Sequence, residues 1–337
     1  MKKHTYHFYK CPFTFTPLIV FVLLLSFACG KEKPEGPQTD NSRITKVLAD
    51  NFNLSLFSTA VKHGIMDKTL LEDGPFTVLA PSDAAFALAG YSDIPGIITT
   101  NADVVSSLVR YHVIDGRIEL EKLPYGFNQE LTSRGGKLYV THWIRGLDTA
   151  ITINGARVMR SNIAASNGNI QVLNRVLQPA VHSTLAEAVA SDENLTLFAQ
   201  AMKVSGLLDT VASKGLYTIF APNNAAMVAQ GYATVQQINE TAPAVLKKLL
   251  SYHILRNRRF ISDYILSAGP ADTNEQVMLD GNKTEIVLLQ DPAEPGGFGG
   301  ISLKGAVNTD NVYLQKQDMA AGNGVLHILN GVLLAAP

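Results

Sequence analysis

Residues 76–86 read Phe76-Thr77-Val78-Leu79-Ala80-Pro81-Ser82-Asp83-Ala84-Ala85-Phe86, and 141 positions later the chain reads Tyr217-Thr218-Ile219-Phe220-Ala221-Pro222-Asn223-Asn224-Ala225-Ala226-Met227. A second phrase, built on Tyr111-His112, returns at the same spacing as Tyr252-His253. A third phrase, Val172-Leu173-Asn174-Arg175-Val176-Leu177, returns 156 positions later as Ile328-Leu329-Asn330-Gly331-Val332-Leu333. Three phrases in the same order indicate one domain used twice. The period is far longer than the ~20–50 residues of a solenoid repeat, so each copy can bury its own core.

Local physical chemistry explains the first repeated phrase. The short apolar run at residues 76–79, ended by Pro81, predicts a buried strand. Ser82 is a favourable N-cap for a following helix, and Asn223 holds the same place in the second copy. A strand, a proline stop, a cap and a helix therefore account for this phrase without any catalytic role.

The Tyr-His phrase fits the end of an amphipathic helix. Val105, Leu108, Val109 and His112 are spaced as one helix face, and the same spacing recurs up to His253. Each histidine is therefore expected on an apolar face near the helix C-terminus. A buried imidazole needs a hydrogen-bond partner, and we expect a backbone carbonyl to supply it.

The remainder of each copy is rich in strand signals. Asn154-Gly155 and Asp280-Gly281 each stand between two apolar runs and predict hairpins. The Gly- and Pro-rich residues 291–300 predict an exposed loop. A helical pattern at Leu54, Phe57 and Val61 opens the first copy. Helices grouped beside a mainly β half predict an α+β fold, with the boundary between copies near residues 178–182.

The three phrases resemble the conserved blocks of the fasciclin domain family, also called FAS1, over residues 44–337. The resemblance implies two tandem fasciclin-like domains, 44–180 and 181–337, each a β-sandwich or wedge with helices packed along one side. The closing block of the family usually carries His and Asp where this chain has Gln171, Asn174 and Asn330. These departures weaken the case for a shared ligand site at those positions, while the fold prediction is unaffected.

The N-terminus predicts export. Lysines at positions 2, 3 and 10 precede an apolar run of roughly 13 residues, which is typical of a signal peptide over residues 1–28. Ser26-Phe27-Ala28-Cys29 resembles a lipoprotein cleavage site, although Ser26 stands where leucine is usual. We expect Cys29 to be lipidated, followed by a flexible tether to residue 43; an ordinary signal peptide with an incidental cysteine is the alternative. The protein would then be an outer membrane lipoprotein of the cell envelope, exposed at the surface.

Composition and spacing favour no enzyme class. The formal net charge is −1, which gives no electrostatic case for a nucleic-acid partner. We find no activated nucleophile, metal cluster or cofactor loop with specific spacing, and therefore expect neither metal nor cofactor. Ser82 and Asp83 with His112 are the strongest catalytic alternative, but the helix cap and the apolar face explain them better.

Six residues are candidates for ligand binding. In animal members of the family, the region around the Tyr-His pair is implicated in integrin binding. Trp143 shares a strand face with Thr141, opposite His142 and Ile144, where it can stack on a sugar, anchor a partner or simply pack. The leading hypothesis is adhesion to extracellular protein or polysaccharide, with a periplasm-facing scaffold of an envelope complex as the alternative. The candidates are Tyr111, His112, Tyr252, His253, Trp143 and Phe298.

Overall fold

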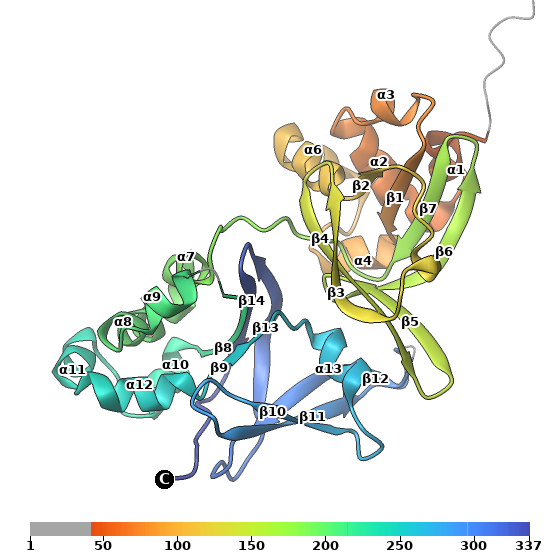
Figure 1. Cartoon of the computed structure of the whole chain (residues 1–337). Helices are drawn as coiled ribbons and strands as arrows, with labels where there is room; N and C mark the ends of the chain where they lie inside the picture. Colours follow the sequence, from red (N-terminus) through yellow and green to blue (C-terminus); the bar gives the residue numbers. More distant parts are fainter. Residues whose placement is uncertain (1–41, 214, 295) are drawn as a thin grey trace, which may run out of the picture. The chain divides into compact units, whose positions relative to one another are not determined.

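The computed structural model describes residues 42–213, 215–294 and 296–337. The predicted signal peptide, the lipidation site Cys29 and nearly all of the tether lie outside these residues. The described chain belongs to one compact unit that contains two seven-stranded sheets (Figure 1). None of the described helices has both the length and the apolar character needed to cross a bilayer.

The two sheets have the same topology. The first runs β2-β1-β7-β6-β5-β4-β3, and the second runs β9-β8-β14-β13-β12-β11-β10 when read from the equivalent edge. In each sheet the parallel pair, β1 with β7 or β8 with β14, lies next to the short edge strand. The first sheet comprises β1 (Phe76–Pro81), β2 (Val113–Asp115), β3 (Gly126–Ser133), β4 (Gly136–Arg145), β5 (Asp148–Ile153), β6 (Ala156–Ala165) and β7 (Gly168–Leu173). The second comprises β8 (Tyr217–Pro222), β9 (Ile254–Arg256), β10 (Thr273–Val277), β11 (Lys283–Gln290), β12 (Phe298–Lys304), β13 (Val312–Ala321) and β14 (Gly324–Leu329).

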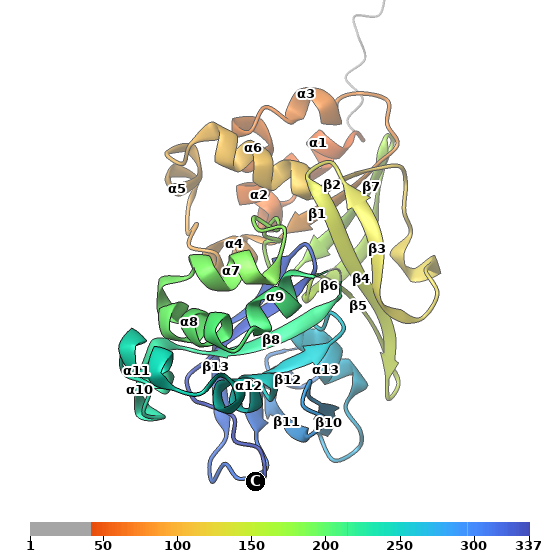
Figure 2. The same ribbon diagram turned by 60° about the vertical axis from the view of Figure 1, so that its left-hand side comes forward.

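In each copy most helices gather on one side of the sheet (Figure 2), whereas the helix Ile261–Ser267 of the second copy lies in the other hydrophobic layer, beside β12. The first copy has α1 (Ile44–Ala49), α2 (Ser55–His63), α3 (Asp67–Leu70), α4 (Asp83–Leu88), α5 (Ile94–Ile98) and α6 (Ala102–Tyr111). The second has α7 (Leu185–Ser191), α8 (Thr196–Val204), α9 (Leu207–Ala212), α10 (Asn224–Ala229), α11 (Val235–Glu240), α12 (Pro243–Ser251) and α13 (Ile261–Ser267). Short 3-10 turns at Phe52–Leu54, Leu120–Lys122 and Glu193–Leu195 complete the described elements.

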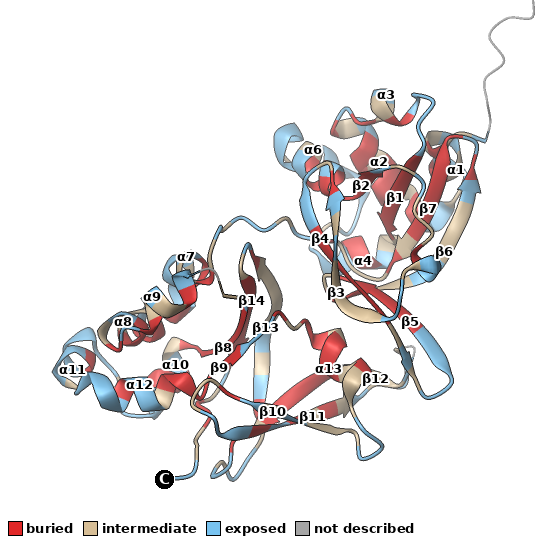
Figure 3. Cartoon of the chain, in the orientation of Figure 1, coloured by how far each residue is buried: buried red, intermediate tan, exposed pale blue. Residues whose placement is uncertain are grey.

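Each copy contains two hydrophobic layers separated by its central strands. Val78 and Ala80 of β1 pack against the helices, whereas Leu79 between them packs against β4 and β5. Strand β6 makes this arrangement possible, because it pairs with β5 at its start and with β7 along the rest. Figure 3 shows the result as continuous burial along the central strands. The α+β fold with helices along one side is confirmed.

Both predicted hairpins form. The loop predicted for residues 291–300 is wrong from Phe298 onward, because these residues belong to a strand. Asn154 and Gly155 take positive φ values of 47° and 82° between β5 and β6. Strand β12 begins at Phe298, which pairs with Gln290. The glycines there permit close approach, since a Cβ at Gly299 would lie 2.9 Å from the Asp291 side chain. Their abundance therefore reflects strand packing as well as a turn.

The closing Asn-Gly pair of each copy secures the helices to the sheet. Asn323 accepts a hydrogen bond from the Leu185 backbone at 2.7 Å and donates to the Val211 and Ser213 carbonyls. Asn167 makes the equivalent set of bonds in the first copy. The glycine that follows lies against the neighbouring parallel strand, and a Cβ on Gly324 would be 2.1 Å from the Tyr217 carbonyl oxygen.

Replacing Gly324 with alanine is expected to lower the free energy of unfolding by about 1–3 kcal/mol, because β8 and β14 would have to separate. Gly269→Ala is the control, since nothing lies within 4 Å of a Cβ at that position. Chemical denaturation of both variants checks the prediction. Equal stability of the two variants would contradict the close approach.

Candidate functional site

The two Tyr-His pairs lie inside the protein. His112 and His253 are fully buried, and the two tyrosines beside them are almost so. The His112 Nδ1 lies 2.8 Å from the Leu108 carbonyl, and its Nε2 accepts a hydrogen bond from the Leu177 backbone at 3.0 Å. The carbonyl bond requires the proton on Nδ1. Burial lowers the pKa of His112 to about 4, so the ring is neutral at pH 7.

The same arrangement recurs in the second copy. His253 bonds the Leu249 carbonyl at 3.0 Å and accepts from the Leu333 backbone at 2.9 Å. The expectation of a carbonyl partner is thus confirmed for both histidines. The Tyr252 hydroxyl donates to the Lys283 carbonyl at 2.6 Å, as the Tyr111 hydroxyl does to Lys137. All four side chains face inward, so their role in binding a partner stays a prediction that this conformation does not favour.

Ser82, Asp83 and His112, the catalytic alternative, make no hydrogen bonds of a catalytic triad with one another; each is bonded elsewhere. The Ser82 hydroxyl caps α4 by accepting from the Ala85 backbone at 3.2 Å. Asp83 accepts from the Ser55 hydroxyl and the Leu56 backbone at the start of α2. Both ring nitrogens of His112 are engaged with the backbone. These residues therefore serve as caps and a bridge between elements.

The departures from the family's closing block preserve its hydrogen bonds. His327 accepts from the Asp318 backbone at 3.1 Å and bonds the Arg259 carbonyl at 3.2 Å. In the first copy, the Gln171 oxygen accepts from the Asn162 backbone at 2.9 Å, replacing the imidazole nitrogen. Asn174 and Asn330 likewise accept from the backbone of the adjacent strand in both copies. The polar positions of this block are explained by architecture.

Replacing His327 with glutamine is expected to reduce acid sensitivity. Burial lowers the pKa of His327 to about 4 from an ordinary 6.5, so its stabilising contribution is complete above pH 6.5 and is lost as the pH falls toward 4. Glutamine does not titrate and serves the same role in the first copy. Between pH 7 and 4.5 the variant should lose about 2–3 kcal/mol less stability than the parent.

Unfolding titrations of both proteins at several pH values measure this difference. The nearby carboxyl of Asp318 has its pKa raised to about 6, mainly by burial, so its contribution falls as the pH rises through 6. Because both proteins retain Asp318, the comparison isolates His327. Equal acid-induced losses in the two proteins would show that His327 does not carry the effect.

One buried carboxylate joins the two copies. Asp263, in α13 of the second copy, accepts from the Asn128 amide at 2.9 Å and the Thr141 hydroxyl at 2.7 Å, both in the first copy. It also accepts from the Phe260 backbone at 2.9 Å. Asp263 is fully buried, and burial raises the pKa of its carboxyl. Three donors thus compensate for removing this group from water.

Arginines surround this contact. The Arg258 guanidinium lies 3.5 Å above the centre of the Tyr139 ring and donates to the Gly322 carbonyl at 2.8 Å. Further ion pairs between the copies join Arg145 to Asp272 at 2.8 Å and Arg175 to Asp318 at 3.2 Å. A buried cation over an aromatic ring contributes about 1–2 kcal/mol. The outer face of β4 is therefore a docking surface for the second copy.

Trp143 and Phe298 lie at this same contact. Trp143 is partly buried, and its ring centre is 4.5 Å from that of Phe127, which packs under Arg259. Its neighbour His142 bonds the Leu123 carbonyl, while Thr141 bonds Asp263 across the contact. Phe298 packs under Arg145 at 4.4 Å. Neither aromatic ring is a freely projecting anchor, and their role in binding an external ligand stays a prediction.

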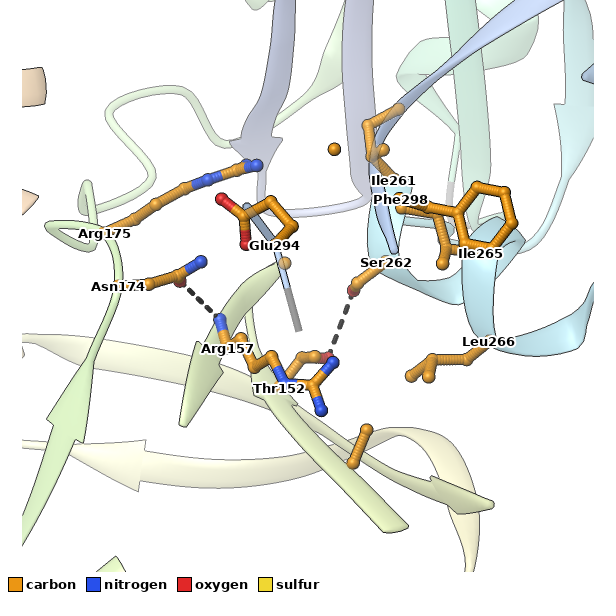
Figure 4. A pocket seen from close by; sticks show the side chains of 13 residues that line it. Thr152, Arg157, Asn174, Arg175, Ile261, Ser262, Ile265, Leu266, Glu294 and Phe298 are labelled. Carbon is orange, nitrogen blue, oxygen red and sulfur yellow. Dashed lines mark hydrogen bonds between the residues drawn. The ribbon is translucent and has the colours of Figure 1, made fainter. Parts of the chain in front are cut away.

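A small cavity lies at the edge of the contact. Figure 4 shows Thr152 and Ser262 bonded across it, at 3.1 Å, with Arg175, Glu294 and Phe298 among its walls. Its volume is about 50 Å³, whereas one water occupies about 30 Å³ of liquid. The cavity therefore accommodates about one or two waters, and no substrate-sized ligand.

Sequence reasoning missed Asp263 and Arg258. A carboxylate between Ile261 and Tyr264, on a helix with no other charged residue, was the available signal, because buried charges require specific partners. Asn128 and Thr141, the partners of Asp263 in the first copy, lie more than a hundred residues away and leave no local pattern.

These observations agree with comparison to known proteins. The chain belongs to the fasciclin domain family, whose model matches residues 52–179 and 193–335. Human periostin is 28% identical over 262 residues, covering 77% of this chain and 28% of periostin. The pig transforming growth factor-beta-induced protein ig-h3 is 25% identical over 77% of this chain and 35% of its own length. The chain thus spans about a third or less of these animal relatives.

A bacterial relative and a solved structure complete the comparison. Protein sll1483 of Synechocystis is 31% identical over 137 residues, which are 40% of this chain and 73% of that protein. A solved FAS1 domain pair from the insect cell adhesion molecule fasciclin I is 17% identical, with a TM-score of 0.40, over 85% of this chain and 98% of the pair. None of these proteins is named for an enzymatic activity.

Proposed function

We propose that this protein is a lipid-anchored adhesion protein of the bacterial cell envelope, which binds extracellular protein or polysaccharide. The observation that carries the proposal is that the residues of the family's motifs hold the fold together and are not available to a ligand. The Tyr-His pairs, the closing Asn-Gly pairs and Gln171 or His327 are all engaged in backbone hydrogen bonds. Recognition therefore falls to the outer surfaces of a two-domain unit, as suits an adhesion protein.

Anchoring and pairing both support this function. A lipidated Cys29 with a tether of about 14 residues would let the domains range about 20 Å from the membrane on a root-mean-square basis. The contact through Asp263 joins the two domains, so both would meet a ligand surface from one anchor. Linking two modest binding surfaces raises the overall affinity through effective concentration.

Adhesion of whole cells tests the proposal. Cells that produce the full chain are compared with cells lacking it and with cells producing Cys29→Ala, on plates coated with matrix proteins or polysaccharides. We expect the full chain to increase retention and Cys29→Ala to abolish the increase by releasing the protein. If the full chain increases cell retention on none of the coatings, adhesion is contradicted. Recovery of one stoichiometric envelope partner would instead favour the scaffold function.

A further inference from the structure

The second copy carries an open apolar groove on its helical side. The groove has a volume of about 470 Å³ and runs between α12 and the residues that follow β14. Val245 and Leu249 of α12 line one side, Leu334 and Ala335 line the other, and Tyr232 is also among the lining residues. Val245 is 54% exposed, so an apolar surface faces solvent here. Small-molecule sites in proteins typically have volumes of about 300–1,000 Å³ and mainly apolar walls, and this groove has both properties.

The first copy has different chemistry in the corresponding region. There, α6 and Pro179 border a hollow of about 440 Å³ whose helical wall consists of Asp103, Ser106, Ser107 and Arg110. Two positions are equivalent by the 141-residue offset: Asp103 corresponds to Ala244, and Ser107 corresponds to Lys248. Val104 and Leu108 correspond to Val245 and Leu249, so at these positions the second copy differs by Ala244 and Lys248 and not by the two apolar side chains.

Lys248 is the one charged side chain among the described residues that line the groove. Gln230 supplies another polar group. The lysine lies one helical turn from Val245 and next to Leu249, so its ammonium can meet an anion while its methylenes extend the apolar wall. One positive charge beside an apolar groove complements a ligand with one negative charge and an apolar chain.

We propose that this groove binds a free fatty acid, with the acyl chain along Val245 and Leu249 and the carboxylate paired with Lys248. The volume lies within the range of small-molecule sites, and an apolar lining with one lysine matches an acyl chain that ends in a carboxylate. The proposal does not depend on adhesion, since its test uses the purified protein and a free ligand. Each methylene that the groove buries should strengthen binding about fourfold.

Calorimetric titration with octanoate, decanoate and laurate tests the proposal. Residues 42–337 are the appropriate protein, because they contain both sheets and all of their core clusters and need no detergent. We expect one saturable site, with affinity rising along the series. Absence of saturable binding, or affinity independent of chain length, would overturn the proposal.

Matched variants locate the site. Val245→Asp should weaken laurate binding at least tenfold, whereas Val104→Asp, at the equivalent and equally exposed position of the first copy, should not. Lys248→Glu should weaken binding, whereas Lys247→Glu, which does not line the groove, should not. Equal effects within either pair would overturn the assignment. Binding to anionic phospholipid vesicles without binding of free laurate would instead identify a membrane-contacting surface and refute the fatty-acid site.

Discussion

Replacing Asp263 with alanine is expected to lower the free energy of unfolding by about 3 kcal/mol and to uncouple the two domains. The substitution leaves the Asn128 amide, the Thr141 hydroxyl and the Phe260 backbone without their shared acceptor. Each buried donor left unpaired costs about 1–3 kcal/mol, partly offset because a costly buried charge is also removed. Heat unfolding should change from one coupled transition to two.

Differential scanning calorimetry measures both effects. Asp263→Asn should be milder, because its amide oxygen still accepts a hydrogen bond from one side. Asp148→Ala is the surface control, because Asp148 is exposed at the start of β5 in the first sheet. This substitution should change stability by less than about 0.5 kcal/mol. If Asp263→Ala melts like Asp148→Ala, the buried carboxylate does not join the domains.

Replacing His253 with alanine should be more damaging still, lowering the free energy of unfolding by about 3–5 kcal/mol. The ring is fully buried and joins the end of α12 to the residues after β14. Its removal leaves a cavity and also unpairs the Leu249 carbonyl and the Leu333 backbone amide. His112→Ala should have the same effect in the first copy, for the same reason.

Urea unfolding gives the stability change, and adhesion of the folded fraction gives the functional change. His182→Ala is the control, because that imidazole is only partly buried and bonds the Ser191 hydroxyl near the surface. A His253→Ala protein with unchanged stability and lost adhesion would show that the Tyr-His pair binds a partner and that His253 is not needed to hold α12 to the residues after β14.

Local patterns predicted the elements because their causes are local. The strand at residues 76–79, the Ser82 cap and the Asn154-Gly155 hairpin each follow from neighbouring residues. The helix spacing also placed His112 on a buried face with a backbone carbonyl as its expected partner, and the structure identifies that partner as Leu108. Its second partner, Leu177, lies beyond the last strand and depends on the folded sheet.

The contact between the domains was not predictable in the same way. Thr141 and Asp263 are separated by 122 residues, and no local pattern selects one for the other. Trp143 was placed on the correct strand face, but alternation cannot show that this face is covered by the second domain. Phe298 was assigned to a loop because glycines signal turns, whereas here they allow a strand to approach Asp291 closely.

Trypsin treatment of intact cells tests the central claim, that the two domains face outward from a lipid anchor. The predicted tether contains Lys31, which is followed by Glu32, so trypsin cleavage there would release both domains together; Lys33 precedes Pro34 and is not a trypsin site. We expect intact cells to release a fragment that carries both fasciclin domains. A chain that stays uncut on intact cells, but is cut once the cells are lysed, would place the domains inside the envelope and contradict adhesion.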